Sequence, residues 1–116
     1  MDAYDVPIIH KCSELFRLLH EYQTAIPKAD RYTIWQRCQN LTLDILEGFL
    51  SAAAEEQNAR MRRLGDVSVK LDMLRLLTRL SFELKAINNK KYLELQTHIE
   101  EIGKMLGGWL RHLRQK

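Results

Sequence analysis

The sequence is poor in residues that interrupt helices. Among its 116 residues are two prolines, Pro7 and Pro27, and five glycines. Proline removes a backbone donor, and glycine costs a helix interior roughly 1 kcal/mol relative to alanine, so both tend to mark helix ends. The long segments between these residues predict an all-α protein.

Long apolar runs are also absent. No run approaches the roughly 18 residues that a membrane-spanning helix needs, and no positively charged leader precedes an apolar block. We therefore expect a cytoplasmic protein with no membrane association. The two cysteines, Cys12 and Cys38, lie in apolar periodic segments, where free thiols behave as small hydrophobes. A chain of this length predicts a single domain over residues 1–116.

Motifs for catalysis and metal binding are missing as well. The sequence has no glycine-rich phosphate loop, no paired-cysteine motif, no histidine pair four residues apart and no Glu-x-x-His motif. The neighbouring Glu100 and Glu101 point to different helix faces, so they do not form an acid–base pair. We expect no enzymatic activity, no metal and no cofactor.

What is present is a spacing of apolar residues at intervals of three and four, which predicts four helices. The first opens at Asp5 and ends before Pro27, and the second runs from about residues 27–30 to 54. The third runs from about residues 59–63 to 87, and a turn at residues 88–91 leads to the fourth, which ends near residue 114. Short connections favour antiparallel neighbours, so the sequence predicts an up-down-up-down four-helix bundle.

The third helix carries two apolar stripes. One contains Val67, Leu71 and Leu74, and the other contains Met73, Leu77, Leu80, Leu84 and Ile87. A helix that is apolar on two sides is usually buried on both. The pattern therefore predicts either a central helix or a subunit contact.

The last helix combines a core stripe with a glycine pair. The stripe contains Ile99, Ile102, Leu106, Trp109 and Leu113. Gly103 and Gly107 lie one turn apart beside it and predict a close-packing seam, within or between subunits. Trp109 belongs either to the core or, with the two glycines, to an oligomer interface.

Charge is distributed unevenly along the chain, whose net charge is +3. Residues 1–59 hold five basic and nine acidic side chains, a balance of −4, and residues 60–116 hold thirteen and six, a balance of +7. In an up-down bundle the third helix begins where the fourth ends. We therefore predict one terminal cluster of cations: Arg60, Arg62, Arg63, Arg111, Arg114 and Lys116. The cluster suits an anionic partner; the alternative is a solvated surface without one.

Arg75 and Arg79 form a second candidate contact on the third helix. Asp72 and Glu83 stand at pairing distance along the helix, so intrahelical ion pairs are the alternative. Contacts of this kind to phosphates are sensitive to salt and independent of base sequence. Because both tryptophans lie in apolar stripes, we predict backbone contacts without base stacking.

Several segments together resemble a known family. The first half contains Ile26-Pro27-Lys28, Asp30-Arg31-Tyr32, Gln36 and Glu47-Gly48. This pattern is similar to the small four-helix proteins encoded by intervening sequences of 23S ribosomal RNA genes. The second half contains Leu71-Asp72-x-Leu74-Arg75-Leu76-Leu77-x-Arg79-Leu80, Tyr92-x-x-Leu95 and the segment from Glu101 to Leu110. It resembles the accessory variability determinant proteins of diversity-generating retroelements, with coverage from about Val6 to Arg114.

The resemblance implies a non-catalytic partner of a retroelement reverse transcriptase. It implies a bundle assembled into a homopentameric ring with a basic surface, which binds template RNA or cDNA and the polymerase during mutagenic retrohoming. Matching positions add Lys104 to the candidate contacts. Because the first half is acidic, the basic surface here is expected on the third and fourth helices only.

Two other functions stay open at this point. One is a stand-alone bundle of ribosomal intervening sequences with no polymerase partner. The other is a purely structural helical oligomer whose charges only confer solubility.

Overall fold

Four long helical arms form the molecule. The computed structural model describes residues 3–115. Their elements are α1 (Asp5–Tyr22), η1 (Gln23–Ala25), α2 (Lys28–Asp30), η2 (Arg31–Trp35), α3 (Gln36–Ala54), α4 (Gln57–Glu83) and α5 (Asn89–Arg114). The segments α2, η2 and α3 follow one another without a break, so they make one arm.

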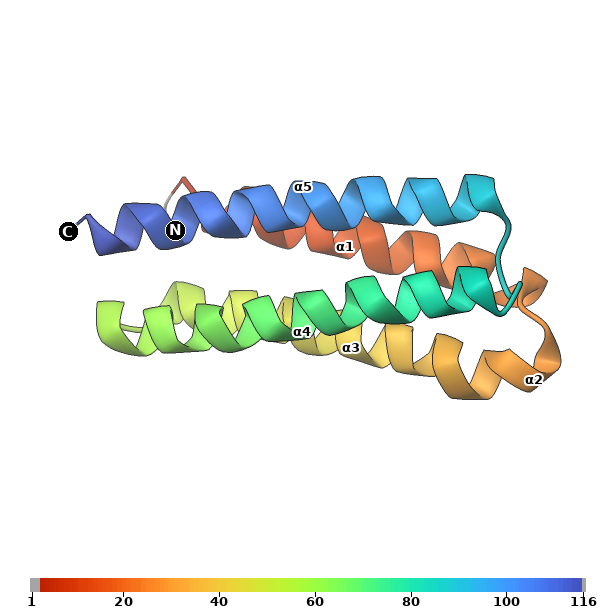
Figure 1. Cartoon of the computed structure of the whole chain (residues 1–116). Coiled ribbons are helices and arrows are strands. Elements are labelled where there is room, and N and C mark those ends of the chain that lie inside the picture. The colour runs from red at the N-terminus through yellow and green to blue at the C-terminus, as the bar shows by residue number, and fades with distance from the viewer. Residues whose placement is uncertain (1–2, 116) are drawn as a thin grey trace.

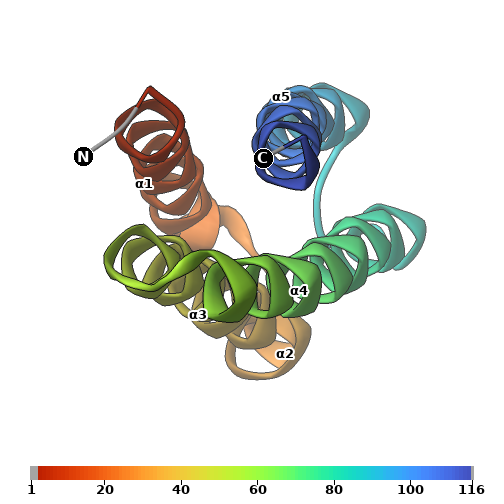
Figure 2. The same ribbon diagram turned by 90° about the vertical axis from the view of Figure 1, so that its left-hand side faces the viewer.

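The arms pack as an antiparallel four-helix bundle, as predicted. Both α1 and α4 contact α3 and α5, so each arm has two neighbours and the remaining pairs are diagonal (Figures 1 and 2). The bundle measures 47 × 21 × 19 Å. The chain termini and the α3–α4 connection lie at one end, and the α4–α5 connection lies at the other (Figure 1).

The predicted core stripes of the first, second and fourth arms are confirmed. The buried positions on α1 include Ile8, Cys12, Leu15 and Leu19, and those on α5 are Leu95, Ile99, Ile102, Leu106, Trp109 and Leu113. Trp35 and Phe49 are fully buried on the second arm. Burial of apolar area stabilises a fold by roughly 25 cal/mol per Å². The helices are therefore most stable when these stripes face the core.

The second arm begins with a π-helical turn that the sequence does not predict. The turn aims Trp35 at α1, where its Nε1 donates to the carbonyl oxygen of Leu19 at 3.0 Å. Arg31 Nη2 donates to the carbonyl oxygens of Ile26 at 3.0 Å and Thr24 at 3.3 Å. Arg31 therefore satisfies backbone acceptors in the connection between the first two arms.

The predicted boundary between the third and fourth helices is wrong by several residues. The helix α4 ends at Glu83 instead of Ile87, and α5 begins at Asn89, so the connection is residues 84–88. The chain turns at Lys85, whose φ is 64°. The backbone amide of Lys85 donates to the carbonyl oxygen of Phe82 at 3.0 Å, and the amide of Ala86 donates to the carbonyl oxygen of Ser81 at 2.8 Å. Such hydrogen bonds end many helices, and the residue with positive φ is then usually glycine. The absence of glycine hides this end from a sequence reading.

The second apolar stripe of α4 is largely exposed, so α4 is not a central helix. Leu77 and Ile87 are buried, whereas Met73, Leu80 and Leu84 are exposed at 38%, 36% and 59%. With two more exposed side chains they form what we call the α4 ridge: Val69, Met73, Leu76, Leu80 and Leu84. Within one chain this ridge has no covering partner among residues 3–115.

The closest helix approach involves Gly48 on α3. A Cβ added to Gly48 would overlap Cγ2 of Val67 on α4. Val67 is only 2% exposed, so it has no free space to enter. Gly48 therefore sets the spacing of α3 and α4. The sequence predicts a close-packing seam at Gly103 and Gly107, and not at Gly48.

Candidate nucleic-acid interface

The predicted meeting of the start of α4 with the end of α5 is confirmed. Gln57 Nε2 donates to the carbonyl oxygen of Leu113 at 2.8 Å, and the Arg60 guanidinium lies 6.0 Å from the centroid of the Trp109 ring. Figure 2 views this end of the bundle along the helices. The described members of the terminal cluster thus gather at one end, and Lys116 lies outside the described residues.

Arg60 has a structural role in this region. Its Nε donates to the carbonyl oxygen of Ala52 at 2.7 Å, and its Nη2 donates to that of Ala53 at 3.1 Å. These acceptors belong to the last turn of α3, whose carbonyls have no partners within the helix. Arg60 therefore caps α3 and stacks on Trp109, and its position is set by the fold.

Trp109 is part of the core. Its side chain is fully buried within a single chain. It presents no surface to a second chain, so of the two predicted alternatives for Trp109 the structure shows the core.

Arg63 pairs with Glu55, which reduces the positive charge of the cluster. Arg63 Nε donates to Glu55 Oε1, and Nη2 donates to Oε2 at 3.1 Å. The Arg63 guanidinium lowers the pKa of the Glu55 carboxyl, and the charges of Arg62 and Arg60 act in the same direction. Since the pair is exposed, it contributes little to stability. Arg62, on the same turn, makes no ion pair within residues 3–115.

Arg111 and Arg114 are exposed and make no ion pair within residues 3–115. A Cβ on Gly107 would lie 3.4 Å from Nη1 of Arg111, and one on Gly108 would lie 3.9 Å from Nη2. The two glycines thus leave room for the Arg111 guanidinium along the helix. Gly107 lines the groove between α5 and α4, but no described atom of α4 lies within 4 Å of such a Cβ, so the helices do not pack closely at Gly107 inside one subunit.

Arg75 lies in a groove between α4 and α5, and two carboxylates hold it. Its Nη1 donates to Asp72 Oδ1 at 2.7 Å and its Nε donates to Glu100 Oε1 at 3.0 Å. A Cβ on Gly103 would lie 3.4 Å from Arg75 Nη2 and 3.8 Å from Leu71 Cδ2. Gly103 therefore makes room for the Arg75 side chain.

Arg75 pairs with Asp72, and Arg79 Nε lies 3.6 Å from Glu83 Oε1. These pairs confirm the predicted alternative of ion pairs within α4. Glu100 was not predicted, because it comes from the other helix. Lys104, exposed beside the same groove, has no ion pair among residues 3–115. Among the predicted site cations within residues 3–115, Arg60 caps α3, and Arg63, Arg75 and Arg79 pair with carboxylates. Arg62, Lys104, Arg111 and Arg114 do neither.

Other kinds of site find no support in the described chain. Within residues 3–115, no group of three or more histidine, cysteine, aspartate or glutamate side chains could hold a metal ion. In the same range no helix is long and apolar enough to cross a membrane. Cys12 and Cys38 are free and buried, and burial raises the pKa of each thiol to about 12. Neither thiol is therefore set up as a nucleophile.

Sequence reasoning missed the lysines around the α4–α5 connection, Lys85, Lys90 and Lys91. Lys90 and Lys91 were predicted only as polar turn residues. Lys85 was predicted to lie inside the third helix, so its turn conformation could not be anticipated.

Comparison with known proteins bears on the chain as a whole. A family model described as bAvd-like matches residues 7–113, which is almost the entire sequence. No curated protein matches the chain. The match spans the four arms and agrees with the resemblance noted in the second half of the sequence. The chain therefore belongs to the bAvd-like family, the accessory variability determinant proteins of diversity-generating retroelements.

Proposed function

We propose that this protein is the non-catalytic accessory subunit of a diversity-generating retroelement, and that it binds both nucleic acid and the reverse transcriptase during mutagenic retrohoming. Family membership supports the accessory role. The observation that carries nucleic-acid binding is the unpaired part of the terminal cluster. Arg62, Arg111 and Arg114 are exposed at one end of the bundle, and no carboxylate within residues 3–115 pairs with them.

Such cations bind through phosphates. Each phosphate neutralised by an arginine releases a counterion, so affinity falls as salt rises and depends little on base sequence. Template RNA and its cDNA both present this backbone. Lys104 extends the same basic surface along α5. Arg75 and Arg79 bind phosphate only if the ligand displaces their carboxylate partners, so their contribution is smaller.

Assembly into a homo-oligomer, a five-membered ring, is the second part of the proposal. The α4 ridge supports it, because contiguous exposed apolar side chains mark interaction surfaces on proteins. Val69 is 69% exposed and Leu76 51% exposed, and both would be covered by a second copy of the chain. The partly exposed backbone at Gly107 allows a further close approach.

Association with the polymerase and RNA is testable with the full chain. The tagged protein is mixed with the reverse transcriptase encoded beside its gene, and separately with structured template RNA, at low salt. We expect capture of both. Capture of neither would rule out the proposal.

The ribosomal intervening-sequence alternative makes a different prediction about the gene. A reverse transcriptase gene with template and variable repeats should flank the gene under our proposal, and a 23S ribosomal RNA gene should surround it under the alternative. The purely structural alternative predicts that charge reversal at Arg111 and Arg114 leaves every interaction except self-assembly unchanged.

A further inference from the structure

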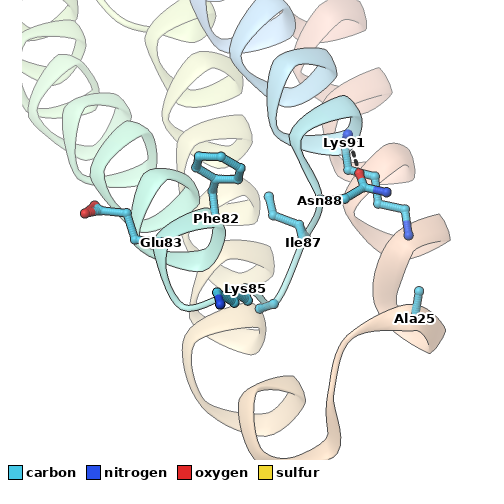
Figure 3. A pocket seen from close by; sticks show the side chains of 8 residues that line it. Ala25, Phe82, Glu83, Lys85, Ile87, Asn88 and Lys91 are labelled. Carbon is cyan, nitrogen blue, oxygen red and sulfur yellow. Dashed lines mark hydrogen bonds between the residues drawn. The ribbon is translucent and has the colours of Figure 1, made fainter.

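A cavity of about 620 Å³ opens beside the α4–α5 connection, at the end of the bundle opposite the terminal cluster (Figures 1 and 3). Its walls include two cations, Lys85 and Lys91, one carboxylate, Glu83, and the side chains of Ala25, Phe82 and Asn88. The volume lies within the range of about 300 to 1,000 Å³ that is usual for pockets that bind small ligands. The cavity is therefore large enough for one nucleotide.

The cations of this cavity have no carboxylate partners. No ion pair within residues 3–115 involves Lys85 or Lys91, the two lysines that line it. The carboxylates nearby are engaged elsewhere, because Glu83 pairs with Arg79 at 3.6 Å and Glu94 accepts a hydrogen bond from the Tyr22 hydroxyl. The Lys91 ammonium lies 5.2 Å from the centroid of the Tyr22 ring, and in Figure 3 the Glu83 carboxylate points away from the loop.

The backbone of Lys85 is strained. Its φ of 64° lies in the left-handed region, where a side chain meets a steric penalty that glycine avoids. The helix-ending hydrogen bonds at this position need only a backbone amide, so glycine would serve the fold better. A lysine held in such a conformation at the wall of a cavity suggests that its charge has a use there.

An aromatic ring lies beside these cations. Phe82 lines the cavity and stacks on Tyr92, with the ring centroids 4.7 Å apart and an angle of 11° between the planes. This stacking fixes the Phe82 ring, which is partly exposed, whereas Ile87 is buried in the core. A fixed aromatic ring beside cations is the combination that binds unpaired nucleotides, by base stacking and phosphate contact.

We propose that this cavity binds one unpaired nucleotide of a single-stranded nucleic acid, with the base against Phe82 and the phosphate at Lys85 and Lys91. The inference rests on the proposed nucleic-acid binding and adds a base-contacting site to it. The terminal cluster contacts backbone at one end of the bundle, and this cavity holds a single-stranded segment at the other.

Lys85→Gly is the sharpest test, because it separates stability from binding. Glycine relieves the backbone strain, so the variant should melt at a higher temperature than the wild type. It also removes a phosphate contact, so its affinity for a labelled tetrathymidylate, measured by fluorescence anisotropy at low salt, should fall about fivefold. Phe82→Leu keeps an apolar side chain but removes the ring, and should lower the affinity about tenfold.

Lys70→Ala is the matched control, since Lys70 is an exposed lysine among Asp44, Glu47 and Asp66, far from the cavity. It should change the affinity for tetrathymidylate less than twofold. The inference is overturned if Lys85→Gly and Phe82→Leu bind tetrathymidylate as the control does. In that case retained binding of long structured RNA would leave the proposed function intact. Absence of binding to both probes by the wild type would overturn the inference and the nucleic-acid part of the proposed function together.

Discussion

Replacing Gly48 by alanine probes the packing that sets the bundle. In a solvent-exposed helix interior, glycine to alanine stabilises by roughly 1 kcal/mol. Gly65 on α4 fits that description, because a Cβ there would meet nothing within 4 Å. At Gly48 the same Cβ would overlap Val67 Cγ2, and Val67 is almost fully buried. Overpacking of this kind costs about 1 to 3 kcal/mol.

The comparison of the two substitutions isolates the overpacking cost. Gly48→Ala should be less stable than Gly65→Ala by about 1 to 3 kcal/mol in urea unfolding followed by circular dichroism at one fixed protein concentration. The double variant Gly48→Ala with Val67→Ala should be more stable than the sum of the two single changes in unfolding free energy predicts, by at least about 0.5 kcal/mol. Equal stabilisation by Gly48→Ala and Gly65→Ala would refute the close approach of α3 and α4.

Three further predictions follow from the same contacts. Arg60→Ala should destabilise by about 1 to 3 kcal/mol in urea unfolding, because the Ala53 carbonyl loses a side-chain donor and the Ala52 carbonyl keeps only the Glu55 amide. Exposed Arg62→Ala should change stability by less than about 0.5 kcal/mol. Leu76→Glu should lower the sedimentation coefficient of the assembly; an unchanged profile would remove the α4 ridge as an interface. Arg63→Gln should raise the NMR-measured pKa of Glu55 toward its ordinary value. Because the fold lowers the pKa of Glu55, the ionised carboxylate stabilises the fold at pH values above the ordinary glutamate pKa. This stabilisation is lost as the pH falls through the pKa of Glu55 in the folded state.

Much of the fold could be predicted from apolar spacing. Core stripes such as Ile8 to Leu19 and Ile99 to Leu113 are buried where the three-and-four pattern places them. The end of α4 could not be predicted, because it depends on a lysine in a conformation that sequence rules reserve for glycine. Apolar pattern also could not tell an internal stripe from an exposed one. Leu71 and Met73 both follow helical spacing, and only the packing of α3 and α5 decides that Leu71 is buried.

The candidate site was predictable in location and less so in composition. Topology alone placed the start of α4 beside the end of α5. Which cations are unpaired depends on contacts between elements, such as Arg63 with Glu55 and Arg75 with Glu100, and these are invisible in local sequence. Arg60 illustrates the limit most clearly, because its capping of α3 depends on contacts with another helix that the sequence does not reveal.

The salt dependence of RNA binding tests the central claim most directly. We compare the wild type with a variant in which Arg62, Arg111 and Arg114 are changed to glutamine. The control variant carries glutamine at three exposed cations outside the cluster, namely Arg17, Arg37 and Lys70. Three lost phosphate contacts should reduce the slope of log affinity against log salt by about 2 to 3 in magnitude. The account predicts this reduction in the cluster variant and little change in the control. Equal slopes for all three proteins would contradict it.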